Sequence, residues 1–176
     1  FILPIVIARS LIPDDFAGYR MVWLVIGTLM GFATLQIPQS LSYFLPRIKQ
    51  TEKIVYILGA MYILVILAIL ASLLVNPWFP ILPLKWIQIE GPIWFYSVFI
   101  FIWVISSLLD WLPVADGRAS LQARFIVTLA IVRVFSVSTV AWYYGTLDAV
   151  LYALILFAFF KLTLLLFYIL YFHKLN

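Results

Sequence analysis

Two basic residues lie deep inside long apolar stretches of this chain, and they carry its strongest chemical signal. Arg133 lies near the centre of residues 125–144, and Lys161 near the centre of residues 148–172. A cation at the centre of a bilayer costs several kcal/mol unless it pairs, faces water or extends to the membrane surface. The sequence offers no acidic residue at the same depth. We therefore predict that both cations line a water-filled cavity and bind an anion.

Other polar residues share one face of the first of these stretches. At about 100° per residue of helix, Thr128, Ser136, Thr139 and Arg133 fall within an arc of about 140°. Such an arc is typical of the wall of a polar cavity. These four residues and Lys161 are the candidate substrate-binding residues.

Asp110 is the acidic residue nearest to an apolar stretch, and it fits two interpretations. It could titrate in an ion-coupled transport cycle, or it could lie among lipid headgroups and cap the end of a helix. The second interpretation is favoured, because Asp110 falls close to the end of its own stretch, 92–114.

The residue types needed for most enzyme chemistry are absent. The chain has no cysteine and one histidine, His173, which excludes disulfides and thiolate chemistry and leaves little to bind a metal. It has no HExxH, no Gly-rich phosphate loop and no GxSxG, and its seven acidic residues are scattered. We predict no catalytic residue, metal or cofactor. A membrane-embedded enzyme stays as an alternative.

The elements that position these residues are transmembrane helices. Of the 176 residues, 66% are hydrophobic and 10% charged, whereas a soluble domain has about 25% charged residues. A span needs about 20 apolar residues. The sequence predicts an all-α polytopic bundle of about six helices. The predicted spans are the tail of a first helix at 1–7, then 16–43, 54–75, 92–114, 125–144 and 148–172.

Individual residues predict where these spans begin, bend and pack. Asp14 and Asp15 are expected to cap the second span after a loop at 9–15. Pro38 should kink that span near its end and expose a carbonyl. Gly27 and Gly31 form a GxxxG, which predicts close packing on a neighbouring helix.

Loop charges predict how the chain is oriented. Positively charged residues accumulate on the cytoplasmic side of membrane proteins. The loops after spans two, four and six hold Arg47, Lys49, Lys53, Arg118, Arg124 and Lys174, and the opposite side holds Arg9, Arg20 and Lys85. The first side should be cytoplasmic, and the Pro-rich segment 76–92 should be an external, interfacial loop. The net charge of +4 then reflects basic loops and does not indicate nucleic-acid binding.

Two segments carry a resemblance to a known family. Residues 8–19 read ARSLIPDDFAGY and resemble the pattern AR-x-L-G-P-x-D-F-G-x-Y between the first two helices of polysaccharide-exporting flippases. Residues 35–47 read LQIPQSLSYFLPR and are similar to the end of the second helix in that family. The family belongs to the multidrug/oligosaccharidyl-lipid/polysaccharide exporter superfamily. Ile12 and Ile37 stand where glycine is usual, so those turns should be less tight. The basic loop before span five and residues 171–174 fit more loosely.

The resemblance implies a half-transporter. Members of the superfamily have two six-helix lobes, so residues 1–176 would form a single N-terminal lobe with most of its first helix missing. The implied function is flipping of undecaprenyl-diphosphate-linked oligosaccharides across the cytoplasmic membrane by alternating access, for cell-surface polysaccharide. The implied partners are this lipid-linked substrate, membrane lipid and a C-terminal lobe. The alternative within the same fold is a drug or ion-coupled exporter, which would typically need carboxylates in its cavity.

Overall fold

The computed structural model describes residues 2–49, 52–75 and 93–173, and every regular element in these ranges is helical. Two short 3-10 segments, η1 (Leu45–Arg47) and η3 (Ser107–Asp110), join longer helices. The α-helices are α1 (Ile2–Ser10), α2 (Pro13–Ala33), α3 (Ile37–Phe44), α4 (Lys53–Leu74), α5 (Ile93–Ser106), α6 (Leu112–Ala115), α7 (Ala119–Tyr144) and α8 (Leu147–Phe172).

Five helical stretches are long and apolar enough to cross a membrane, which makes this chain a multi-pass membrane protein. They are Pro13–Ala33, Lys53–Leu74, Trp94–Ala115, Ala119–Tyr144 and Leu147–Phe172. Lipid offers no hydrogen bonds, so a spanning segment must satisfy its backbone internally, and a helix does so. With the short α1, these helices confirm the predicted all-α bundle of about six.

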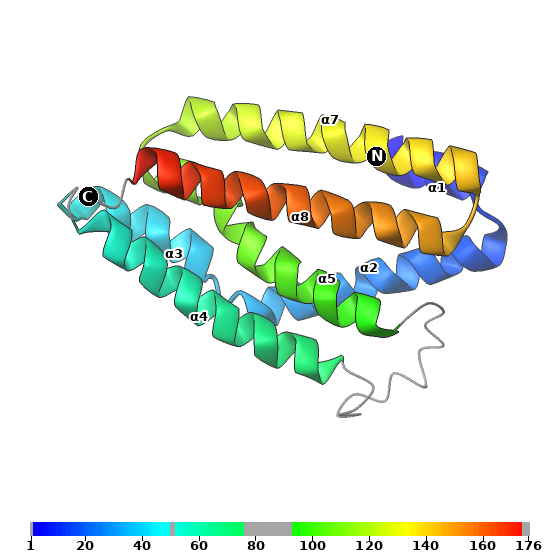
Figure 1. The fold of residues 1–176 in the computed structure, drawn as a ribbon, viewed down its shortest axis with the longest axis horizontal. Helices are drawn as coiled ribbons and strands as arrows, with labels where there is room; N and C mark the ends of the chain where they lie inside the picture. Colours follow the sequence, from blue (N-terminus) through cyan, green and yellow to red (C-terminus); the bar gives the residue numbers. More distant parts are fainter. Residues whose placement is uncertain (1, 50–51, 76–92, 174–176) are drawn as a thin grey trace.

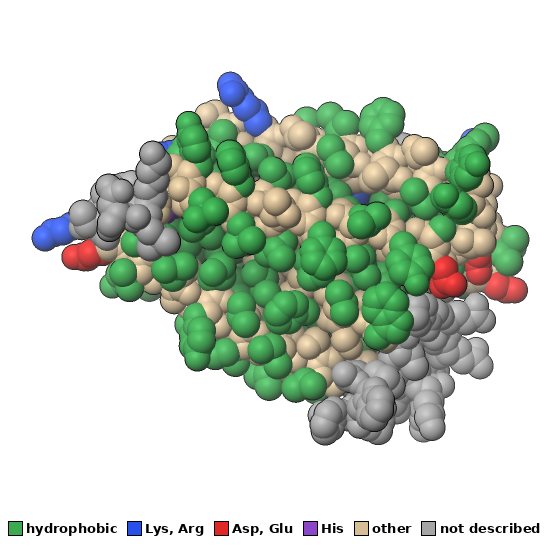
Figure 2. Space-filling model, viewed as in Figure 1, with side chains coloured by type: hydrophobic (Ala, Val, Ile, Leu, Met, Phe, Trp, Pro, Cys, Tyr) green, Lys and Arg blue, Asp and Glu red, His purple; other side chains and the backbone are tan. Residues whose placement is uncertain are grey.

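α5 occupies the middle of the bundle. α7 and α8 run side by side along one edge, α4 lies at the opposite edge, and α5 lies between α4 and α8 (Figure 1). In the apolar stretch of the span that contains α5, 67% of the residues are buried, against 17% in that of α7. Apolar side chains cover most of the face in Figure 2, and charged side chains gather mainly toward its two ends. This distribution suits a protein whose outer surface contacts lipid.

Two predicted loops are shorter than expected, because the helices beside them are longer. α7 begins at Ala119, so Arg124 belongs to the helix and not to the preceding loop. Residues 119–124 contain no Gly or Pro, and the long side chain of an exposed arginine can extend to the membrane surface. The predicted loop at 9–15 shrinks to residues 11 and 12, because α1 continues to Ser10 and α2 begins at Pro13.

The expected kink at Pro38 is a complete break. α2 ends at Ala33, and both Leu35 (φ 44°) and Gln36 (φ 57°) adopt the left-handed region that non-glycine residues rarely occupy. Pro38 lies in the first turn of α3, where its missing amide leaves no helical hydrogen bond unmade. The proline therefore starts a new helix instead of bending an old one.

Asp15 caps a helix other than its own. Asp14 and Asp15 were expected to cap α2 from the preceding loop, but both lie in its first turn and neither caps it, since the N-cap is Ile12 and no side chain caps this helix. The carboxylate Oδ2 of Asp15 instead accepts a hydrogen bond from the backbone amide of Leu147, at 3.1 Å. Leu147 is the first residue of α8, after α7 ends at the left-handed Gly145 (φ 62°). An ionised carboxylate at this position also complements the positive end of the α8 dipole. The turn before α2 and the turn before α8 are thus joined.

Replacing Asp15 by Ala should therefore lower the free energy of unfolding by about 1–2 kcal/mol, the usual value of a helix cap. Asp14→Ala is the matched control, since it removes the same charge from the same turn but from an exposed side chain that has no partner among the described residues. Thermal unfolding in detergent would compare the two. Equal losses would mean that the contact with Leu147 contributes nothing.

The glycine pair in α2 does not pack inside this chain. Gly27 and Gly31 are exposed, and a Cβ added to either would meet nothing within 4 Å. The predicted close helix contact is therefore wrong for the part of the chain that the structure describes. The predicted interfacial loop at 76–92, with Lys85, lies outside the described residues.

Candidate functional site

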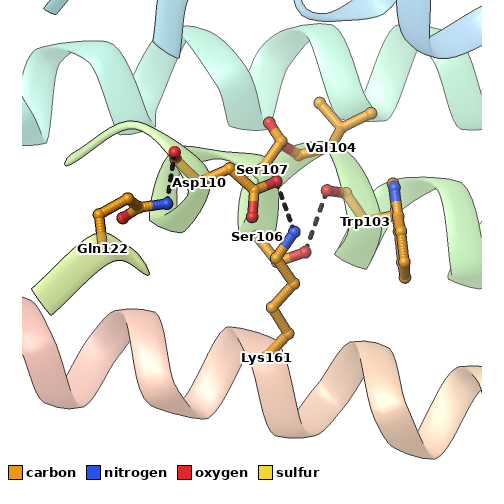
Figure 3. Close-up of polar contacts among 7 residues, drawn as sticks. All are labelled: Trp103, Val104, Ser106, Ser107, Asp110, Gln122 and Lys161. Atoms are coloured by element: carbon orange, nitrogen blue, oxygen red, sulfur yellow. Dashed lines mark hydrogen bonds and ion pairs between the residues drawn. The ribbon is translucent and has the colours of Figure 1, made fainter. Parts of the chain in front are cut away.

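Lys161 forms an ion pair inside the bundle. Its Nζ lies 2.7 Å from Oδ2 of Asp110, and only 6% of the Lys161 side chain is exposed, against 42% for Asp110 (Figure 3). We expected no acidic residue at the same depth as Lys161, and for Asp110 this expectation was wrong. The pair links α8 to η3.

Local structure explains why Asp110 reaches Lys161. α5 tightens into η3 (Ser107–Asp110), and the chain continues as α6 within the same span, which ends at Ala115, close to the predicted end at 114. Gln122 on α7 donates from Nε2 to the backbone carbonyl of Asp110, at 2.6 Å, and fixes the turn (Figure 3). The flexible four-carbon stem of lysine covers the remaining distance.

Arg133 has no carboxylate partner among the described residues. Its guanidinium carbon lies 4.7 Å from the ring centre of Trp23 on α2 and 5.9 Å from that of Trp103 on α5. Tyr19 also interacts with this guanidinium, while the Nε of Arg133 is buried with no hydrogen-bond partner. Aromatic faces stabilise a cation without neutralising it. Arg133 therefore keeps a full positive charge available to a ligand.

Two cavities meet at Arg133. The larger, of about 740 Å³, lies between α1, α2 and α7 and includes Tyr19, Arg20 and Trp23. The smaller, of about 240 Å³, lies between α5, η3, α7 and α8 and includes Trp103, Asp110 and Lys161. Arg133 lines both cavities. Trp103 approaches both cations, since Lys161 Nζ lies 5.1 Å from its ring centre. The site thus combines three basic groups, one carboxylate and two tryptophans.

The other predicted site residues are dispersed. Ser136 lines a separate, mainly apolar cavity of about 540 Å³, and its hydroxyl donates to the backbone carbonyl of Arg133. Thr128 and Thr139 are exposed and line none of these three cavities. Arg133 lies at one edge of the predicted arc, so it points into the bundle while the two threonines, farther round the helix, point out.

Several residues of the site were not predicted from sequence. They are Tyr19, Arg20, Trp23, Trp103 and Gln122. One signal was present: Tyr19 and Trp23, like Phe99 and Trp103, are spaced i, i+4 on one helix face. The rings of Trp23 and Trp103 pack edge to face, with 5.9 Å between their centres. This aromatic contact holds α2 against α5 beneath Arg133.

A second polar cluster lies at the C-terminal end of α8, around Asp116, which directly follows the span that ends at Ala115. Asp116 Oδ2 accepts a hydrogen bond from the hydroxyl of Tyr168 at 2.7 Å and lies 2.7 Å from His173 Nε2. Lys53 Nζ lies 3.8 Å from its other oxygen. Burial alone would raise the pKa of Asp116, but the hydrogen bonds from His173 and Tyr168 and the charges of His173 and Lys53 outweigh it and hold the pKa below 3.8. No group of three or more metal-ligating side chains occurs in the described ranges.

This cluster predicts how stability depends on pH. Because folding lowers the pKa of Asp116 below 3.8, its ionised form favours the folded state above about pH 4, and that contribution is lost as the pH falls through the folded pKa. Asp116→Asn should be less stable at pH 7 and should lose less stability on acidification than the unsubstituted chain. Thermal unfolding between about pH 7 and pH 3 measures this difference. Glu52→Gln, at an exposed position near the same end, is the control and should behave like the unsubstituted chain.

Comparisons with known proteins add no assignment to this geometry. A scan against models of protein families gave no match, and searches of curated proteins and of solved structures gave none either.

Proposed function

We propose that this chain is one lobe of a membrane exporter that flips lipid-linked oligosaccharide diphosphates between the leaflets of the cytoplasmic membrane. The observation that carries the proposal is Arg133, a cation without a carboxylate partner in the described part of the chain, placed where two cavities meet. The flippase-like segments 8–19 and 35–47 support it. The second lobe would close the cavities on the side that this chain leaves open.

The chemistry of the cavities favours an anionic substrate. A diphosphate crosses hydrocarbon only if its charge is compensated, and a guanidinium grips phosphate oxygens with two parallel hydrogen bonds. The two cavities together contain Arg20, Arg133 and Lys161 but only Asp110 as a carboxylate. Their net charge is therefore positive. The tryptophans beside Arg133 suit the sugar rings or the lipid next to a diphosphate.

The cavities also support transport over catalysis. Arg133 lines both the cavity that contains Arg20 and the one that contains Lys161, so a charged group could move past it from one cavity to the other. Rocking of two lobes about such a site would expose it to each leaflet in turn. The loops after the second, fourth and sixth spans would be cytoplasmic.

A drug or ion-coupled exporter is the second candidate, and one observation favours it. Asp110 is a carboxylate that lines a cavity and is 42% exposed, which is the type of group that binds a cationic substrate or a coupling ion. However, Asp110 is already paired with Lys161, and Arg133 lies across the same cavity. A cationic substrate would meet two positive charges there.

A reconstitution experiment separates the two candidates. The whole two-lobe protein is placed in vesicles that contain a fluorescent undecaprenyl-diphosphate oligosaccharide in both leaflets. A membrane-impermeant quencher then measures how fast the inner-leaflet pool reaches the outside. We expect protein-dependent flipping of this lipid and no extrusion of a cationic dye. Dye extrusion without lipid flipping would support the second candidate and contradict the first.

A further inference from the structure

The ion pair between Asp110 and Lys161 raises a question about the proposed site. Lys161 is the buried member of the pair, and its ammonium group lies in the same cavity as Arg133. An ammonium group already bound to a carboxylate cannot bind a phosphate at full strength. An anion in this cavity would also be repelled by the negative charge of Asp110. The pair as it stands thus opposes the binding of an anion.

The two members of the pair are held very differently. The backbone carbonyl of Asp110 is fixed by Gln122, but among the described residues the carboxylate has only Lys161 as a partner (Figure 3). The Asp110 side chain is 42% exposed, whereas that of Lys161 is 6% exposed. The carboxylate can therefore rotate away from Lys161 and out toward solvent while its backbone stays in place. Lys161 has no comparable freedom.

Among the described residues, the surrounding elements bring no other carboxylate that could pair with Lys161. α3, α5 and α6 contain no charged residue. From α7, Gln122 is neutral, Arg133 is a cation, and Arg124 is exposed on the surface. From α8, Lys161 is the charged group that lines this cavity. With no second carboxylate at this cavity in the described ranges, an incoming anion is the group that can take over Lys161 when Asp110 leaves.

We propose that Asp110 is an internal competitor, which occupies Lys161 until a substrate phosphate displaces it. This inference rests on the proposed anion site and adds a residue that sets its affinity. Displacement changes the net charge that the cavity presents from +1, with Arg133, Lys161 and Asp110 all facing it, to +2 with only the two cations. The empty site thereby avoids an uncompensated buried lysine, and the occupied site gains a second cation for the phosphate.

The test is to titrate the full chain in detergent with inorganic pyrophosphate and to measure the affinity by calorimetry. Asp110→Asn should bind pyrophosphate about tenfold more tightly than the unsubstituted chain, because the competitor is gone while an amide oxygen still accepts a hydrogen bond from Lys161. Lys161→Met should bind at least about tenfold more weakly, in line with the loss of one charge-assisted contact. The double variant should resemble Lys161→Met. Asp14→Asn is the control for the change in net charge and should leave the affinity unchanged.

The outcomes separate this inference from the proposed function. If neither the unsubstituted chain nor Asp110→Asn binds pyrophosphate, both the anion site and the inference fail. If the unsubstituted chain binds but Asp110→Asn binds equally or less tightly, the inference alone fails. A double variant that binds as tightly as Asp110→Asn would also overturn it, because the gain would not come from Lys161.

A second measurement covers the case in which Asp110→Asn does not fold. A hydrophobic carbodiimide modifies carboxyl groups, and mass spectrometry of the unsubstituted chain reports the modification of Asp110. Pyrophosphate should increase this modification, since it releases the carboxylate from Lys161. Unchanged or reduced modification would overturn the inference.

Discussion

Export should fall by about ten- to a hundredfold when Arg133 is replaced by Ala, the range expected for loss of hydrogen bonds between charged groups worth about 1.5–3 kcal/mol. The reason is that Arg133 lines both cavities and is not neutralised by a carboxylate among the described residues. Arg133→Lys should lie between Ala and the unsubstituted protein, because an ammonium group keeps the charge but cannot bind a phosphate bidentately. The measurement is surface polysaccharide in cells that express the whole protein, normalised to the amount inserted in the membrane.

Arg124→Ala provides the matched control on the same helix. Arg124 is exposed and lines none of the three cavities, so its loss should leave export unchanged. Normal export by Arg133→Ala at normal protein level would remove Arg133 from the site. A lower protein level with normal export per molecule would assign Arg133 a structural role instead.

The largest effect on stability should come from Asp110, and it should be unequal to the effect of its partner. Asp110→Leu leaves Lys161 buried and uncompensated, which should cost about 3–5 kcal/mol. Lys161→Met leaves a carboxylate that is 42% exposed, so its cost should be about 1 kcal/mol or less, as for a partly solvated pair. Thermal unfolding in detergent gives both values.

The double variant Asp110→Leu/Lys161→Met tests the origin of this asymmetry. It replaces the whole pair by apolar groups, and such replacements are often neutral. We expect it to be nearly as stable as the unsubstituted chain and clearly more stable than Asp110→Leu. Additive losses in the double variant would show that the two side chains contribute independently.

The spans could be predicted from sequence because they depend on the length and composition of continuous segments of the chain. Residues 54–75 and 148–172 were expected to be helical, and α4 (Lys53–Leu74) and α8 (Leu147–Phe172) begin one residue earlier. The irregularity near Pro38 was expected as a kink within one span, but the structure has a complete break at Leu35 and Gln36. Composition, length and proline chemistry each depend on neighbouring residues alone.

The site was harder to predict because it depends on how the helices pack. Judged from its position along the sequence, Asp110 was placed too far from Lys161, because that judgement took no account of the tightening at η3 or of the reach of a lysine side chain. The predicted polar arc placed Thr128 and Thr139 in the same cavity wall as Arg133. A helix at the edge of a bundle buries only part of its circumference, so the two threonines are exposed. The partner of Asp15 lies 132 residues along the chain, and no local pattern could indicate it.

That long separation has a consequence for biogenesis. The carboxylate of Asp15 is made first, and the amide of Leu147 follows 132 residues later, on the hairpin of α7 and α8. Until that hairpin inserts, the N-terminus of α2 carries a carboxylate without its partner, and the start of α8 has an amide without an acceptor. The hydrogen bond between the Leu147 amide and the Asp15 carboxylate forms only when α7 and α8 pack against the helices made before them. This one hydrogen bond therefore forms only after the hairpin of α7 and α8 has inserted, and a nascent chain stalled before that hairpin would leave the carboxylate of Asp15 without this partner.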